Sequence, residues 1–304
     1  MLNHDVYRCV ELHRSMGFKF RIQALLLKNY VAFAEAHGDR FIRASRAIEW
    51  AGQAPSAPQR YNRLATVRRC ALALHAERVQ HEVPPDDVYG RSWFKRIPPY
   101  LYTPKQIAQL IEAARHLEPQ GSIRPLTYAT IFGLLAATGL RVSEALALAV
   151  SDLAADGLLI RATKFKKDRL VPVHASTRAA LERYLAARRR LSCVDHTLFV
   201  SPAGAAVRYS TVNTVFRSLA RRVGLRPAPG ARGPRLHDLR HTFAVRSLER
   251  CRIDRQSVAR HMAGLSTYLG HAHVSDTYWY LQATPALMQQ IAHAGDALHR
   301  GELS

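Results

Sequence analysis

Cationic, imidazole and phenol side chains gather in one stretch of the chain, residues 235–281. It contains His237 and Arg240 in an H-x-x-R pattern, then His271 after a glycine, and Tyr280 nine residues beyond His271. An arginine presents a planar fork of N–H donors that can hold two phosphate oxygens. An imidazole can donate a hydrogen bond or move a proton near neutral pH, and a tyrosine hydroxyl can form a covalent intermediate once its proton is removed. Together these residue types suit attack on a phosphodiester.

Two upstream segments add further charged side chains. ATGLRVSEALAL contains Arg141 and Glu144, which would by themselves form an ordinary i,i+3 ion pair at a helix start. RATKFKKDRLVPV places Lys164, Lys166 and Lys167 in a predicted turn between two β-rich runs. Lysines at a turn are by themselves ordinary solvated charges, so their meaning depends on the rest of the chain.

Five segments in this order resemble the tyrosine recombinases, the phage integrase family of site-specific DNA recombinases. The resemblance rests on TGLRVSE, the lysine turn, the H-x-x-R of HDLRH, the L-G-H of YLGHAH and the tyrosine nine residues after that histidine. It implies that DNA strands are cut and rejoined through a 3′-phosphotyrosine intermediate. The residues that it assigns to catalysis are Arg141, Lys164, His237, Arg240, His271 and Tyr280, with Glu144 in support.

The resemblance also implies a role for each residue. Arg141 and Arg240 neutralise the non-bridging phosphate oxygens as charge builds in the transition state. His237 and His271 hydrogen-bond the phosphate and assist proton movement, and either of them could take the tyrosine proton. Glu144 orients neighbouring groups rather than reacting.

The lysine is identified by counting along the predicted hairpin. In the family, a lysine before K-x-R-x-V-P protonates the leaving 5′ oxygen. Counting back from Val171 selects Lys164, with Lys166 as the alternative. Lys166 and Lys167 are otherwise interpreted as solvated charges.

The nucleophile has to be distinguished from Tyr278, two residues before Tyr280. Side chains two apart on a helix point about 200° away from each other, so both tyrosines cannot face one phosphate. The family's spacing from His271 selects Tyr280. A phenol has a reference pKa of about 10, so it needs cations around it before it can attack phosphorus. The candidate cations are the two arginines and Lys164.

The histidines also allow a metal-binding interpretation. His237 and His241 stand in H-x-x-x-H, and His271 and His273 could complete a site. The glutamate of an H-E-x-x-H motif is missing, and no nearby cysteine or acidic pair supplies a further ligand or base. No carboxylate cluster for Mg²⁺ is present in the sequence either. We therefore expect a covalent mechanism without metal or cofactor, and interpret His241 as a packing residue or as one that supports the site residues.

Two other functional classes share part of the pattern. A type IB topoisomerase-like or telomere-resolving enzyme uses similar Arg, Lys and Tyr chemistry, although the spacing fits the integrase pattern better. A DNA-binding regulator that has lost catalysis would keep the same fold, although every key position is filled in this chain. A covalent protein–DNA adduct would separate an enzyme from a regulator, and a recombinant product would separate a recombinase from a topoisomerase.

The charge of the chain favours a polyanionic partner. It has 44 basic and 23 acidic side chains, a formal net charge of +21 and a pI of about 10.6. Double-stranded DNA is the first candidate, because phosphate neutralisation supplies most non-specific affinity for DNA. The resemblance adds a homotetramer on two synapsed DNA sites, a mobile DNA element as the setting, and room for accessory proteins.

Neither a membrane nor an oxidising compartment is indicated. The longest apolar run, 129–140, contains two glycines and is far shorter than the ~20 residues of a membrane span. The N-terminus lacks the apolar core of a signal peptide. The four cysteines are scattered, with no C-x-x-C pair, which favours reduced thiols in the cytoplasm.

The elements that position these residues are expected to form two domains, because a chain of 304 residues is longer than the usual single domain. Residues 1–96 are predicted to be helical, and the resemblance makes them a core-type DNA-binding domain. One predicted apolar stripe comprises Ile22, Leu26, Tyr30 and Phe33, and a second comprises Leu64, Val67, Ala71 and Leu74. Three cations lie off the second stripe: Arg63, Arg68 and Arg69. They are either a solvated face or a clamp on the DNA phosphate backbone.

Residues 97–304 are the expected catalytic domain, after a linker at 91–102 that contains two prolines. The fold class is mainly α with a small β-hairpin or sheet (α+β). Helices are predicted from Pro104 (capped by Thr103), at 126–138 before Gly139, and at 142–149, 177–190 and 211–223. Strands are predicted at 157–163, 169–173 and 197–200, and a loop at 226–234. The apolar segment at 284–298 is predicted to dock as an arm on a neighbouring subunit.

Overall fold

The computed structural model describes residues 1–90, 98–161, 168–193, 195–226, 233–251, 255–271, 273 and 275–282. The chain divides into two compact units, Met1–Ile97 and Pro98–Ser304, and each has its own hydrophobic core. Helices predominate, and the named strands form one three-stranded antiparallel sheet. The predicted mainly helical fold with a small sheet is confirmed. Within the described part of the chain, no helix is long and apolar enough to cross a membrane.

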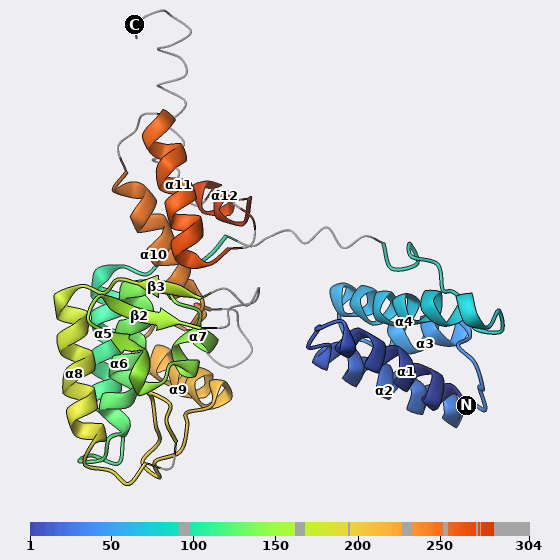
Figure 1. Ribbon diagram of the computed structural model, residues 1–304, viewed down its shortest axis with the longest axis horizontal. Coiled ribbons are helices and arrows are strands. Elements are labelled where there is room, and N and C mark those ends of the chain that lie inside the picture. The colour runs from blue at the N-terminus through green and yellow to red at the C-terminus, as the bar shows by residue number, and fades with distance from the viewer. Residues whose placement is uncertain are drawn as a thin grey trace, which may run out of the picture. The chain divides into compact units, whose positions relative to one another are not determined.

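The N-terminal unit is a bundle of four helices (Figure 1), in which α4 packs against the other three. They are α1 (Leu2–Ser15), α2 (Arg21–Ala36), α3 (Ala44–Gly52) and α4 (Ala57–Glu77). The stripe predicted on α4 is confirmed, because Leu64, Val67, Ala71 and Leu74 are all buried.

The stripe predicted on α2 is wrong in part. Ile22 is 65% exposed, and of the four predicted residues only Tyr30 is fully buried. The buried residues of α2 are Leu27, Tyr30, Val31 and Ala34. Apolar residues occupy more than one face of this helix, so their spacing alone does not identify the face that meets the core.

The helices of the C-terminal unit are α5 (Pro104–Arg115), α6 (Arg124–Thr138), α7 (Val142–Ala147), α8 (Ala175–Arg188), α9 (Tyr209–Arg222), α10 (Asp238–Glu249), α11 (Arg255–Leu269) and α12 (Ser275–Gln282). Helix α6 is buried along most of its length and packs against four of the others, α5, α7, α8 and α10. Helix α6 packs between α5 and α8 (Figure 1). The predicted start of α5 is confirmed, since Thr103 and Gln106 form a reciprocal capping box. The predicted stop of α6 at Gly139 is confirmed as well.

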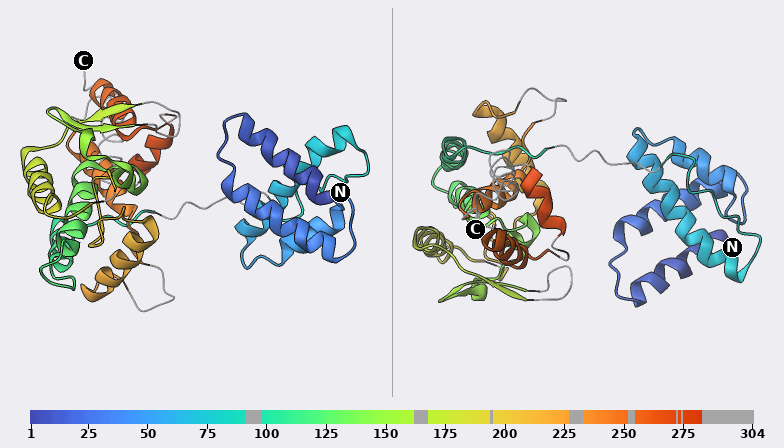
Figure 2. Two further views of the ribbon diagram at one scale, coloured as in Figure 1. Left: turned by 60° about the horizontal axis from the view of Figure 1, so that its bottom comes forward. Right: turned by 90° about the horizontal axis from the view of Figure 1, so that it is seen from above.

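The small sheet lies at an edge of the C-terminal unit (Figure 2). Its strands are β1 (Leu153–Ala154), β2 (Gly157–Ile160) and β3 (Arg169–Val171). The predicted hairpin is confirmed: Leu158 pairs with Val171 and Ile160 with Arg169. The short strand β1 was not predicted. The strand predicted at 197–200 is wrong, because this segment makes isolated bridges at its two ends, Ala149 to Thr197 and Val200 to Ala206.

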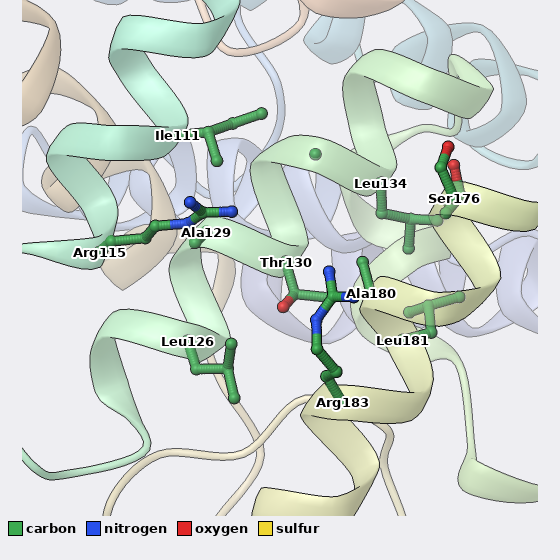
Figure 3. Close-up of a pocket in the computed structure, with 12 residues that line it drawn as sticks. Ile111, Arg115, Leu126, Ala129, Thr130, Leu134, Ser176, Ala180, Leu181 and Arg183 are labelled. Carbon is green, nitrogen blue, oxygen red and sulfur yellow. The ribbon is translucent and has the colours of Figure 1, made fainter.

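A groove of about 220 Å³ opens between α5, α6 and α8 (Figure 3). Its walls include Ile111, Leu126 and Leu134, and Arg115 and Arg183 reach toward it from opposite sides. None of the predicted site residues that the structure describes lines this groove.

Several sequence predictions fall outside the described residues. They concern part of the linker (91–97), the hairpin turn with Lys164 and Lys166 (162–167), most of the 226–234 loop, and the C-terminal arm (284–298).

Candidate active site

The turn after α6 places Arg141. Gly139 ends the helix in the left-handed region, with φ 62°, and a Cβ there would lie 2.5 Å from Phe243 Cδ1 and 3.3 Å from Leu269 Cδ2. Glycine is therefore required for both conformation and space. Arg141 comes two residues after Gly139 and immediately before α7, and its side chain is 31% exposed.

Glu144 lies between two arginines. Its carboxylate accepts hydrogen bonds from the backbone N–H of Arg141 (3.0 Å) and from the Arg141 guanidinium (2.8 Å). On the other side it accepts two from the Arg169 guanidinium, at 3.2 and 2.8 Å. Burial alone would raise the pKa of Glu144, but the bonds from Arg169 and Arg141 outweigh burial and leave the pKa below its usual value. The carboxylate is therefore charged at neutral pH.

Arg240 lies on α10 and is buried against the C-terminal end of α11. It is 2% exposed and donates hydrogen bonds to the carbonyls of Gly139 (2.8 Å) and Leu269 (2.7 Å). Arg141 donates to the next carbonyl, that of Gly270, at 3.0 Å. Helix C-termini leave carbonyls without intrahelical partners and carry partial negative charge, so α11 is suited to hold two guanidinium groups together. Burial and the charge of Arg141 lower the pKa of Arg240 to about 10, which keeps it protonated at neutral pH.

The two tyrosines of α12 occupy opposite environments. Tyr280 is 3% exposed, whereas Tyr278 is 55% exposed. The ring of Tyr280 stacks on that of His271, with 5.9 Å between centroids and 21° between planes. Nδ1 of His271 lies 2.8 Å from the hydroxyl of the buried Thr277. Of the two tyrosines, only Tyr280 faces the arginines and His271.

The first turn of α10 brings two more imidazoles beside Tyr280. The rings of His237 and His241 are 4.9 Å apart, and those of His241 and Tyr280 are 5.5 Å apart. Sequence reasoning treated His241 as a packing residue or as one that supports the site residues. It contacts the tyrosine ring directly, and its buried Nδ1 has no hydrogen-bond partner among the described residues.

Burial dominates the protonation of these rings. It lowers the pKa of both His241 and His271 to about 4, helped at His241 by His237 and at His271 by Arg240 and Arg141. His237 reaches solvent, yet partial desolvation and the charge of Arg240 lower its pKa too. His241 and His271 are therefore neutral hydrogen-bonding groups at pH 7.

The pKa of Tyr280 shows two opposing effects. Burial raises it, and the charge and hydrogen bond of Arg240, together with the charge of Arg141, lower it by less. The arginines thus act in the direction expected from the sequence, but the free protein holds Tyr280 as a protonated phenol.

The structure brings together five of the six predicted catalytic residues and the supporting Glu144. Lys164 lies outside the described residues, between β2 and β3 in the sequence. Arg169 and Thr277 contact these groups and were missed by sequence reasoning. The only sequence signal for Arg169 was its place in K-x-R-x-V-P. Within the described residues, no group of three or more His, Cys, Asp or Glu side chains gathers as metal ligands would.

Comparison with known proteins identifies the family of this chain. The phage integrase family matches residues 101–286. A protein named as an integrase/recombinase, y4rB of Sinorhizobium fredii (strain NBRC 101917 / NGR234), is 40% identical over 297 residues, which cover 94% of each chain. The tyrosine recombinase XerD of Brucella abortus biovar 1 (strain 9-941) is 30% identical over 75% of this chain and 72% of its own.

Solved structures share the fold at lower identity. The recombinase XerH bound to its difH substrate has a TM-score of 0.64 and 19% identity, over 91% of this chain and 78% of its own. Lambda integrase bound to a core site has a TM-score of 0.63 and 16% identity, over 92% and 94%. The chain belongs to the phage integrase family and is a tyrosine recombinase, an enzyme of DNA strand exchange.

Proposed function

We propose that Tyr280 is the nucleophile that cuts and rejoins DNA at a specific site. The observation that carries the proposal is the position of its hydroxyl, which is buried, hydrogen-bonded to Arg240 and beside His271. The tyrosine oxygen forms a bond to phosphorus at the 3′ end of the cut strand, and the bond from phosphorus to the 5′ oxygen breaks. The 5′ hydroxyl of a partner strand then reverses the reaction, so the energy of the phosphodiester is conserved.

Arg141 and Arg240 hold the scissile phosphate. Their guanidinium groups are already fixed by the carbonyls at the end of α11. Donors fixed in advance stabilise the charge that builds on the phosphate oxygens without further reorganisation. Because the pKa of Tyr280 is raised, its proton leaves as the new bond to phosphorus forms and not beforehand. His237 and His271, together with Lys164 as general acid, complete the proton transfers.

We further propose double-stranded DNA as the partner and a homotetramer on two synapsed sites as the working assembly. The net charge of +21 supports the DNA. Among the structural relatives, a lambda integrase tetramer is bound to a Holliday junction, with a TM-score of 0.61. The arm at 284–298 would dock on the neighbouring subunit. DNA chemistry and the scattered cysteines support action in the cytoplasm.

The two units divide this work in our proposal. The N-terminal unit grips the duplex, and the C-terminal unit cuts it. On α4, Arg63 lies over the Trp50 ring and Arg68 donates to the Pro84 carbonyl, while Arg69 is exposed. Arg69 therefore remains the candidate phosphate contact on this face.

A nicked substrate that traps the intermediate tests the nucleophile. The target duplex is first selected from a random pool by binding, and then nicked near the cut so that the released piece diffuses away. Tyr280→Phe should bind this DNA as the unchanged protein does and give no covalent adduct, because only the hydroxyl is lost. Tyr278→Phe should keep adduct formation. The reverse pattern would move the nucleophile to Tyr278.

A further inference from the structure

Arg169 makes three side-chain hydrogen bonds around the site, although the proposed chemistry does not use it. It is the first residue of β3, directly after the hairpin turn, and its side chain is 12% exposed. Nε donates to the carbonyl of Tyr268 at 2.9 Å, and the two terminal nitrogens donate to the Glu144 carboxylate. All three nitrogens are therefore engaged with the protein.

The acceptors of Arg169 belong to a larger arrangement around His271. Three consecutive carbonyls precede that histidine, and three arginines donate to them: Arg169 to Tyr268, Arg240 to Leu269, and Arg141 to Gly270 and, at 3.5 Å, to Leu269. The arginines come from β3, α10 and the turn before α7, so three distant segments hold one short stretch of backbone.

Glu144 links two of these three arginines. Its Oε1 accepts from both Arg141 (2.8 Å) and Arg169 (3.2 Å). Without Arg169, the Glu144 carboxylate would lose two of its hydrogen bonds from guanidinium groups. The backbone before His271 would lose one of the three arginines that hold it. Space is equally tight, because a Cβ at Gly270 would lie 2.7 Å from the nearest Arg169 nitrogen.

We infer that Arg169 is a positioning residue, which fixes Arg141 through Glu144 and fixes His271 through the backbone before it, without binding DNA itself. The inference rests on the proposed function. Its physical basis is that a displacement of about 1 Å in a reacting geometry can cost roughly 100-fold in rate.

Single-turnover cleavage of the nicked substrate, with protein in excess, separates positioning from mere stability. The rate constant reports the geometry of the site, and the amplitude reports the fraction of correctly folded protein. Arg169→Gln should lower the rate constant roughly 10- to 100-fold and leave the amplitude and the DNA affinity unchanged. Arg169→Lys should recover only part of the rate, because one ammonium cannot bridge Glu144 and the Tyr268 carbonyl in the same way.

A double variant tests the route through Glu144. Residues that act as one unit show non-additive losses, so Arg169→Gln combined with Glu144→Gln should cleave no more slowly than the slower single variant. Arg115→Gln is the matched control: Arg115 also pairs with a glutamate, Glu112 at 3.2 Å, but lies on α5 away from the site. It should cleave at the unchanged rate.

Each of the other outcomes overturns the inference. A lower amplitude with an unchanged rate constant would make Arg169 only a folding residue, and a proportional loss of DNA affinity would make it a phosphate ligand. Losses that multiply in the double variant would remove the route through Glu144. If the unchanged protein gives no adduct at all, the proposed function fails. If the unchanged protein cleaves and Arg169→Gln cleaves at the same rate, only the inference about Arg169 fails.

Discussion

Tyr278 and Tyr280 show how much is decided by a side chain's direction. They are two residues apart on α12, yet one is exposed and the other is buried beside Arg240 and His271. The types and spacing of the motif residues could be predicted from the sequence, because they recur in fixed patterns. Arg169 could not, because its role depends on a contact with Glu144, which lies 25 residues earlier on a different element.

A first prediction concerns the hydroxyl that orients His271. Thr277 is fully buried and its hydroxyl lies 2.8 Å from Nδ1 of His271, so it fixes the orientation of the ring. Thr277→Val should lower the single-turnover cleavage rate by roughly tenfold, in the range seen when an orienting hydrogen bond is lost. Thr277→Ser, which keeps the hydroxyl, should cleave at close to the original rate. Equal rates for the valine and serine variants would show that this bond does not matter for cleavage.

At the scale of elements, the end of a helix could be predicted from the sequence where a single residue sets it. Thr103 and Gly139 mark helix ends through capping chemistry that can be predicted from sequence. The buried face of α2 and the segment at 197–200 could not be predicted, since both depend on which neighbours cover them. The two-residue strand β1 is defined only by its pairing with β2.

The second prediction compares two glycines of the C-terminal unit. Gly139→Ala should destabilise the protein by about 1–3 kcal/mol, because the new Cβ meets Phe243 at 2.5 Å and the residue needs a positive φ. Gly264 lies within α11, where an added Cβ would meet no atom within 4 Å, so Gly264→Ala should stabilise the protein by about 0.5–1 kcal/mol. Denaturant unfolding of both variants measures the two effects. A destabilised Gly264→Ala together with an unaffected Gly139→Ala would contradict the packing described for this region.

At the scale of the whole molecule, charge and burial act in different ways. The excess of basic side chains indicated the class of partner directly from the sequence. Burial of Arg240 and Tyr280 could not be predicted, because it depends on the packing of α10, α11 and α12 against one another.

The third prediction is a loss of stability in acid. The pKa of His241 and of His271 falls from 6.5 to about 4 on folding. Unfolded chains therefore bind protons between these values that the folded protein does not, so the free energy of unfolding should fall as the pH drops from about 6.5 toward 4. Above pH 7 these two groups should add no pH dependence.

Denaturant midpoints at pH 7.5, 6 and 5 measure this trend. His241→Gln should weaken the dependence, whereas His116→Gln, at an exposed position just after α5, should not change it. A His241→Gln variant that follows the original curve would show that this imidazole is already charged in the folded protein.

The fourth prediction concerns salt. Each DNA phosphate neutralised by a basic side chain releases counterions, so log affinity should fall linearly with log salt concentration. For six to ten contacts the loss between 50 and 200 mM salt is about 10³- to 10⁵-fold. Tyr280→Phe should give the same slope in a filter-binding or fluorescence titration, because it removes no charge. A flat plot would argue against the DNA backbone as the main partner.

The most direct test of the central claim is to identify the amino acid that carries the DNA. The covalent complex with the nicked substrate is digested with protease and nuclease, and the remaining nucleotide-linked peptide is sequenced by mass spectrometry. We predict a 3′-phosphate joined to the Tyr280 oxygen in the peptide from α12. A nucleotide on Tyr278 or on any other residue, or a linkage through a 5′-phosphate, would contradict the account.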